Sequence, residues 1–165
     1  MHRHFTVTGF VSHDGRTALH WHRRLGKWLP PGGHVEADED PVQAVLREVH
    51  EETGLEVTIL ERAAFEYATP PQLPTPAAMA VYDIPRDGSF DGPHQHIDFI
   101  YFARPALAAG GGAPTLPVDD DCWTWVDEAT LRAGGTFTHP SGRAAEVPDD
   151  VRELGLAAIA AARGA

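Results

Sequence analysis

The sequence predicts an α+β domain in which a mixed β-sheet packs between helices. Two observations lead to this class. Short segments rich in β-branched and aromatic residues recur along the chain, and few segments show helical spacing of apolar residues. Strands interleaved with few helices are typical of a sheet whose faces are covered by helices. We expect one domain over residues 1–165, because this length suits a single domain and no repeat or linker divides the chain.

The first predicted element is a β-hairpin. Residues 5–12 are rich in β-branched and aromatic side chains and predict a strand. Asp14-Gly15 is typical of a tight hairpin turn, and residues 17–23 predict the returning strand. Residues 28–33 follow as a stiff, proline-containing segment that leads into a glycine-rich turn.

Residues 40–53 carry the strongest helix signal. Asp40 can cap the helix, Pro41 suits the first helical position, and Gln43 completes a capping box. Gly54 is a natural stop at the C-terminal end. The apolar residues of this segment recur at helical spacing and form one stripe: Val42, Val45, Leu46 and Val49.

The remainder of the chain predicts four strands and two helices. The strands are expected over residues 56–67, 79–84, 97–103 and 122–126. Residues 70–76 and 108–117 are rich in proline or glycine and predict loops. A short helix is expected at residues 127–133 and a final helix at about residues 149–162.

The charge balance restricts the partners. Lysine and arginine total 13 against 24 aspartate and glutamate residues, and the formal net charge is −11. Such a surface repels a bare polyanion, so we expect no extended nucleic acid as partner. An acidic protein that acts on phosphates needs cations between the two negative groups.

The sequence also predicts a cytoplasmic protein without a membrane segment. No apolar run is long enough for a membrane span, and the first residues lack the apolar stretch of a secretory signal. Cys122 is the single cysteine and cannot form an internal disulfide, which favours a reducing compartment.

Three carboxylates gather on one edge of the predicted helix. Glu48, Glu51 and Glu52 stand at positions i, i+3 and i+4, beside the apolar stripe. Like charges at this spacing repel, and the C-terminal end of a helix disfavours negative charge. A hard divalent cation such as Mg²⁺ would remove both conflicts, since it prefers oxygen ligands. A solvated acidic face without a ligand is the alternative.

The surrounding residues resemble the Nudix box, GX5EX7REUXEEXGU, in which U is aliphatic. Every fixed position of that pattern is present, and both aliphatic positions are filled. The matching residues are Gly33, Glu39, Arg47, Glu48, Val49, Glu51, Glu52, Gly54 and Leu55. The resemblance implies a Nudix-like α/β/α sandwich and an enzyme that hydrolyses a diphosphate linkage in a nucleoside diphosphate derivative. It also implies Mg²⁺ as cofactor, which Mn²⁺ can replace.

The resemblance implies roles for individual residues. Glu48, Glu51, Glu52 and the carbonyl group of Gly32 become metal ligands, and Glu39 pairs with Arg47 to orient the loop against the helix. A nearby carboxylate acts as general base. Glu48 fits the relatives whose base lies on the box helix, and a downstream acidic turn fits the others: Asp119, Asp120 and Asp121. A solvated acidic turn explains that triplet equally well.

Weaker patterns point to substrate contacts. Arg23, Arg24 and Lys27 precede the glycine turn and could bind the distal phosphates, or they could be solvent-facing charges. Gly33 allows close approach of the backbone to a ligand. The alternating residues His94, His96 and Asp98 could bind a metal or phosphates, or could form a polar strand edge or buried, hydrogen-bonded histidines.

The substrate stays open among small-molecule nucleotides. A nucleoside triphosphate, oxidised or not, and a nucleotide conjugate are the first choices. Pro70 and Pro71 follow Leu55 at a distance that resembles ADP-ribose hydrolysing Nudix enzymes, so ADP-ribose or a sugar nucleotide is an alternative. A Nudix module that senses a nucleotide without cleaving it is a further alternative. Both a monomer and a homodimer remain compatible with the sequence.

Overall fold

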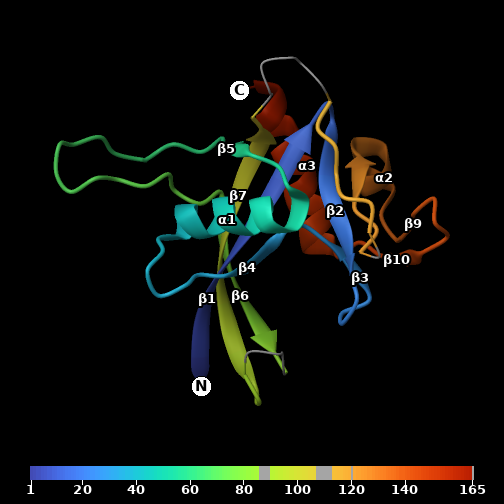
Figure 1. Ribbon diagram of the computed structural model, residues 1–165, viewed down its shortest axis with the longest axis horizontal. Coiled ribbons are helices and arrows are strands. Elements are labelled where there is room, and N and C mark those ends of the chain that lie inside the picture. The colour runs from blue at the N-terminus through green and yellow to red at the C-terminus, as the bar shows by residue number, and fades with distance from the viewer. Residues whose placement is uncertain (86–89, 107–112, 120, 165) are drawn as a thin grey trace.

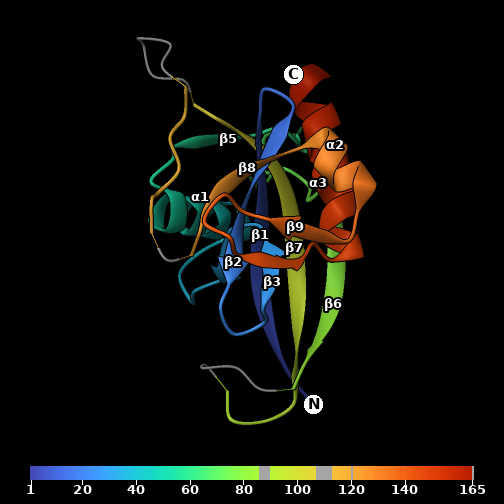
Figure 2. The same cartoon turned by 90° about the vertical axis from the view of Figure 1, so that its right-hand side faces the viewer.

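One mixed β-sheet organises the chain. The computed structural model describes residues 1–85, 90–106, 113–119 and 121–164. Helix α1 (Pro41–Thr53) covers one face of the sheet, while α2 (Glu128–Ala133) and α3 (Asp149–Gly164) cover the other (Figure 1; the side view is Figure 2). The predicted class, a mixed sheet packed between helices, is confirmed. No helix in the described ranges is long and apolar enough to cross a membrane.

Strand β1 (His2–His13) is the centre of the sheet. It pairs in parallel with β7 (His94–Pro105) and antiparallel with both β4 (Gly32–His34) and β2 (Arg16–His22). The other strands extend the two sides of this core pair. They are β5 (Val57–Ile59) and β6 (Ala78–Ile84) beside β7, β3 (Lys27–Leu29) and β8 (Thr124–Asp127) beside β2, and β9 (Thr136–Thr138) and β10 (Ala144–Glu146) beyond β3.

The local signals for the hairpin and the main helix are confirmed. Asp14 and Gly15 both adopt positive φ, as a tight hairpin turn between β1 and β2 requires. The Asp40 side chain accepts hydrogen bonds from the first turn of α1, and the Gln43 side chain accepts one from the Asp40 backbone in return. Gly54 ends the helix in the left-handed conformation, with φ 69°.

Two apolar cores lie on the two faces of the sheet. On one face, Val45 and Val49 of α1 pack with Val7 and Val11 of β1. On the other face, the cluster combines sheet residues with α2 and α3: Phe10, Leu19, Trp28, Ile100, Leu131, Val151 and Ile159. The acidic edge of α1 therefore borders the first core. Side chains on the opposite face of the sheet pack with α2 and α3 instead and are separated from that edge by the sheet.

The strand predicted over residues 56–67 is wrong beyond Ile59. Residues 60–77 form no helix or strand and extend from the body as a long arm, drawn in green in Figure 1. The backbone leaves β7 after Leu60, whose N–H still reaches the carbonyl of Phe102. Phe65 and Tyr67 are 75% and 56% exposed, so their strand-like composition finds no sheet face to pack against.

Other boundaries differ in ways that have local causes. Residues 122–126 were expected as a strand, but β8 begins at Thr124 because Cys122 adopts φ 54° at the end of a turn. Strand β7 begins earlier and ends later than predicted. The sequence did not predict β3, β4, β9 or β10, each only three residues long. Within the predicted 108–117 loop, residues 108–112 lie outside the described residues, and 113–117 have no helix or strand.

Candidate functional site

The glycine turn lies directly against the acidic edge of α1. A Cβ atom added to Gly33 would overlap the carboxylate of Glu48. The N–H of Gly32 donates a hydrogen bond to Oε2 of Glu52, at 3.2 Å. Strand β4 thus brings both glycines to the helix by pairing with Val7 and Thr8 of β1. A side chain at Gly33 would occupy the space that the Glu48 carboxylate fills, and one at Gly32 would overlap the backbone of Val7.

Arg47 connects the loop, the helix and β4. Its guanidinium holds both carboxylate oxygens of Glu39, through Nε at 2.6 Å and Nη2 at 3.0 Å. Its Nη1 reaches Glu48 at 2.9 Å and Glu51 at 3.1 Å, and Nη2 also donates to the carbonyl of His34. The predicted pair of Glu39 and Arg47 is therefore present, and the hydrogen bonds from Arg47 lower the pKa of Glu39.

Burial makes Glu52 the unusual carboxylate of this edge. Desolvation raises its pKa to about 7, although the hydrogen bond from Gly32 opposes the shift. Glu48, Asp121 and Glu51 raise the pKa further through like-charge repulsion. Negative charge here is costly without a counter-cation, which is the environment that a divalent cation stabilises.

The donor set fits a hard cation, but it is not assembled around one. Carboxylate and carbonyl oxygens are the ligands that Mg²⁺ prefers. Among the described side chains, no three His, Cys, Asp or Glu groups are arranged to hold a metal ion as they stand. Arg47 holds Glu48 and Glu51, and Gly32 holds Glu52. Entry of a cation therefore requires these carboxylates to exchange some of their present partners.

The structure separates the acidic residues of the downstream turn. The N–H of Trp21 donates to the carbonyl of Asp121 at 2.7 Å, which fixes the turn beside β2. Asp121 acts electrostatically on Glu52 and forms an exposed ion pair with Arg23 at 3.4 Å. The Asp119 carboxylate instead accepts from the backbone N–H of Asp121 and closes the turn. Asp120 lies outside the described residues.

The predicted substrate residues do not all meet at this site. Lys27 pairs with Glu146 of β10 at 3.5 Å, and Arg24 is exposed beside His22. Asp98 accepts hydrogen bonds from Thr6 and Thr8, and its neighbour on the same face is His96. Asp98 and His96 lie on the sheet face opposite α1, so the structure does not bring them to the box carboxylates.

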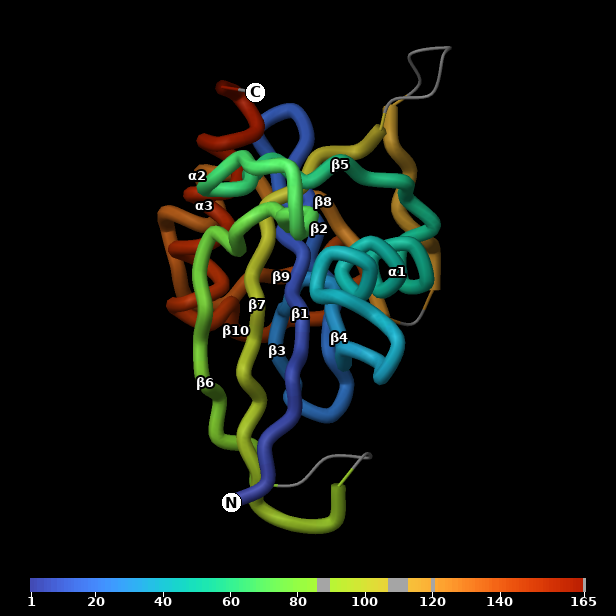
Figure 3. Tube along the Cα trace, turned by 90° about the vertical axis from the view of Figure 1, so that its left-hand side faces the viewer, coloured from blue at the N-terminus to red at the C-terminus, as the bar shows by residue number. Residues whose placement is uncertain are grey.

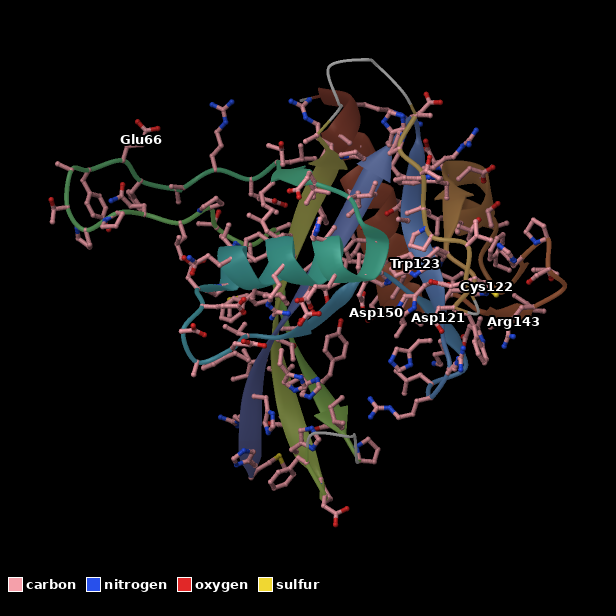
Figure 4. All side chains as sticks on the ribbon, in the orientation of Figure 1. Glu66, Asp121, Cys122, Trp123, Arg143 and Asp150 are labelled. Carbon is pink, nitrogen blue, oxygen red and sulfur yellow. The ribbon has the colours of Figure 1, made fainter. Side chains whose placement is uncertain are left out.

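Sequence reasoning missed His20 and Trp123, which lie beside the turn that carries Asp121. Their rings stack with centroids 4.5 Å apart and planes 14° from parallel. Burial lowers the pKa of His20 to about 4, with a further lowering by His22 and an opposing effect of Asp121. Figure 4 labels Asp121 and Trp123 near the C-terminal end of α1. The sequence shows that His20 and His22 alternate along β2, but it does not show which face of the sheet they lie on.

Neutral His20 gives the fold a specific pH dependence. The pKa of His20 in the folded state, about 4, is below the ordinary value of 6.5, so acid protonates this ring preferentially in the unfolded chain. Stability is lost as pH falls from about 6.5 towards 4, by about 2 kcal/mol between pH 7 and pH 5. We expect His20→Phe to reduce the loss of unfolding free energy between pH 7 and pH 5 by about 2 kcal/mol. Urea unfolding at both pH values measures it, and an unchanged difference between them would contradict the assignment.

Comparisons with known proteins agree with this architecture. The chain matches the NUDIX domain family over residues 2–142. It is 33% identical to the RNA pyrophosphohydrolase of Brucella ovis over 125 residues, covering 72% of this chain and 60% of that protein. It is similar in structure to a NUDIX family hydrolase from Clostridium perfringens, with TM-score 0.64, 25% identity and coverage of 97% and 98%. A UDP-X diphosphatase has TM-score 0.55, 16% identity and coverage of 99% and 64%. The chain thus spans about three fifths of the curated relative's length.

Proposed function

The chain belongs to the Nudix family, and we propose that it hydrolyses a diphosphate linkage in a nucleotide derivative with Mg²⁺ as cofactor. The observation that carries the proposal is the contact of the Gly32–Gly33 turn with Glu48 and Glu52. That contact brings the backbone of the turn against two carboxylates of α1. A purely structural acidic face would not need a turn without side chains against it.

The chain's own residues divide the work of the site. Glu48, Glu51, Glu52 and the carbonyl of Gly32 would hold the cation, which Mn²⁺ can replace. When bound, the cation would neutralise negative charge on the diphosphate and would lower the pKa of an attacking water. Arg47 orients Glu48 and Glu51 from one guanidinium while Glu39 fixes that guanidinium. The missing side chain of Gly33 leaves room for the Glu48 carboxylate against the turn.

Asp121 is the general base that the geometry supports best. It acts electrostatically on Glu52 and is 46% exposed, so it can receive a proton from a water beside the box. Glu48 is the alternative, but Arg47 already holds its Oε1 at 2.9 Å. We expect Asp121→Asn to lower kcat by about a hundredfold or more. Asp119→Asn, which alters the same turn, should have a much smaller effect; equal losses in steady-state assays would exclude a special role for Asp121.

The net charge of the chain and the names of its relatives both bear on the size of the substrate. The net charge of −11 favours a small nucleotide over a long polyanion. The curated relative is named an RNA pyrophosphohydrolase, and this does not support the expectation that nucleic acid is excluded. A structural neighbour is named a UDP-X diphosphatase, which keeps sugar nucleotides among the choices. We favour a nucleoside triphosphate or nucleotide conjugate, with ADP-ribose or a sugar nucleotide as the alternative.

A phosphate-release screen tests the proposal. The panel contains nucleoside triphosphates, 8-oxo-dGTP, ADP-ribose, sugar nucleotides, dinucleoside polyphosphates and a short 5′-triphosphorylated RNA, each with Mg²⁺ and with Mn²⁺. We expect turnover of at least one small nucleotide that EDTA abolishes. Binding of a nucleotide without turnover of any member would instead identify a sensing module. Turnover of the RNA alone would overturn the preference for small substrates.

A further inference from the structure

Four imidazole rings gather on three neighbouring strands, outside the proposed active site. We call His4, His34, His94 and His96 the histidine cluster. His4 of β1 stands opposite His96 of β7, and the register of β4 with β1 places His34 beside them. These strands lie side by side in Figure 3. His94 and His96 are neighbours on β7, and the fold brings His4 and His34 to them from two distant parts of the sequence.

The cluster lies on the sheet face opposite the box helix. Tyr82 of β6 is the register partner of His96, and its hydroxyl donates to Asp150 at the start of α3. Side chains of the alternate set in β1, such as Val7, pack with Val45 of α1 instead. The sheet therefore separates the histidine cluster from Glu48 and Glu52.

The separations within the cluster are those of ligands around one ion. Adjacent ring centroids lie 5.0 Å apart for His4 and His94, 5.1 Å for His94 and His96, and 5.0 Å for His34 and His96. His4 lies 5.2 Å from His34 and 6.0 Å from His96. Four imidazoles that bind a tetrahedral Zn²⁺ through nitrogens at about 2 Å have centroids roughly 5 Å apart. Four of these pairs already have about this spacing, whereas His4 and His96 lie farther apart.

His94 is already in the form that binds a metal. Its Nδ1 lies 2.8 Å from the carbonyl oxygen of Gly92, which can only accept, so Nδ1 carries the proton. In the neutral ring the lone pair is then on Nε2, which lies within hydrogen-bonding distance of Nε2 of His96, at 3.2 Å. The residue is 1% exposed. A backbone carbonyl that fixes the outer nitrogen is the usual support of a metal-binding histidine.

His34 adds a nitrogen that the protein does not use. Its Nε2 is inaccessible to solvent and makes no hydrogen bond within the described part of the chain. A buried polar atom in this condition costs free energy unless a ligand satisfies it. Asp98, by contrast, is satisfied by Thr6 and Thr8, so the cluster is composed of imidazoles rather than of the whole HxHxD pattern.

We propose that the histidine cluster binds one first-row transition metal ion of the Zn²⁺ type through nitrogens of His4, His34, His94 and His96. Imidazole nitrogen suits Zn²⁺, whereas the oxygen ligands of the box suit Mg²⁺. As they stand, the described side chains, these rings included, form no group of three arranged to hold a metal ion. Loading therefore turns the rings about χ2, a torsion with broad minima, while the strands stay in place.

This ion would join the start of the chain to the active-site turn. It ties β1 and β7 to β4 through His34, whose own carbonyl accepts a hydrogen bond from Arg47 at 3.1 Å. Its role is structural, since it lies across the sheet from the box carboxylates. We expect the loaded protein to unfold at a higher temperature than the metal-free protein.

Calorimetric titration of the untagged, metal-free chain with Zn²⁺, in excess Mg²⁺, tests the proposal. We expect one Zn²⁺ per chain, a higher Tm, and intense visible absorption bands of tetrahedral Co²⁺ when Co²⁺ replaces Zn²⁺. The double variant His94→Asn, His96→Asn should weaken Zn²⁺ binding by about a hundredfold or more. Glu51→Gln should leave the binding unchanged, because it alters the box alone. His139→Asn is the matched control, since His139 is half-buried and lies outside the cluster.

Each outcome decides for or against the site. Absence of stoichiometric Zn²⁺ binding to the wild-type chain overturns the proposal. So does binding that Glu51→Gln removes and the double variant keeps, because the ion then occupies the box. If the double variant does not fold by circular dichroism, the single variant His34→Asn and the Co²⁺ spectrum of the wild-type chain decide instead. An octahedral Co²⁺ spectrum contradicts ligation by four imidazoles.

Discussion

Glu52→Gln is expected to lower kcat by about a hundredfold or more without destabilising the fold. The amide keeps the shape of the side chain and can still accept from the N–H of Gly32. It removes one negative charge from the proposed cation site. Burial raises the pKa of Glu52 from 4.5 to about 7, so this carboxyl destabilises the fold increasingly as pH rises from about 4.5 to about 7, and by a constant amount above that range. The variant should therefore be at least as stable as the wild type in EDTA.

Steady-state kinetics with Mg²⁺ and thermal unfolding in EDTA separate these two effects. Glu51→Gln should also lose turnover, although its side chain is 57% exposed and its partner is Arg47. Glu66→Gln is the matched control, because Glu66 is exposed on the arm of residues 60–77 (Figure 4). Wild-type turnover by either box variant would show that the proposed cation ligands are wrong.

Gly33→Ala should inactivate the protein by about a hundredfold while the fold survives. The added methyl group would overlap the carboxylate of Glu48, the mobile end of a side chain that can move aside. Displacement of Glu48 also breaks its contact with Arg47, so one methyl group disturbs the proposed cation site and its support together. Kinetics and the free energy of unfolding from urea titration are the two measurements.

Gly32→Ala provides the contrast on the adjacent residue. Its methyl group would overlap the carbonyl oxygen of Val7, which belongs to the backbone of the central strand. We therefore expect a loss of about 1–3 kcal/mol in the free energy of unfolding. Gly164→Ala is the control, because nothing lies within 4 Å of the added atom. If Gly33→Ala destabilises as much as Gly32→Ala, the turn is a packing feature and its proposed role at the site fails.

Sequence alone predicted the parts of the fold that local chemistry determines. The ends of α1 follow from Asp40, Gln43 and Gly54, and each acts on residues within one turn of itself. The hairpin at Asp14 is local in the same sense. Strand β4 is different, since its Gly-Gly-His sequence favours a turn and becomes a strand only by pairing with β1. The composition of residues 60–67 favoured a strand, but no sheet face receives it.

The candidate site also combines features that local sequence predicts with features that depend on contacts between distant segments. The spacing of Glu48, Glu51 and Glu52 places them on one helix edge, and the box pattern named Glu39 as the partner of Arg47 before its contacts were known. Placement of Asp121 beside Glu52 depends on which face of β2 its turn packs against. The approach of His34 to His96 depends on pairing across three strands. Neither is determined by residues near in sequence.

The parallel pairing of β1 with β7 constrains how the chain can reach this structure. The paired residues are 92 positions apart, so β1 is synthesised long before its partner strand β7. Loop closure over such a distance is slow compared with hairpin or helix formation. Until β7 pairs with it, one edge of β1 is unpaired, and unpaired strand edges make folding intermediates prone to aggregation. The central strand of the mature sheet is thus completed late, and conditions that slow this step favour self-association of nascent chains.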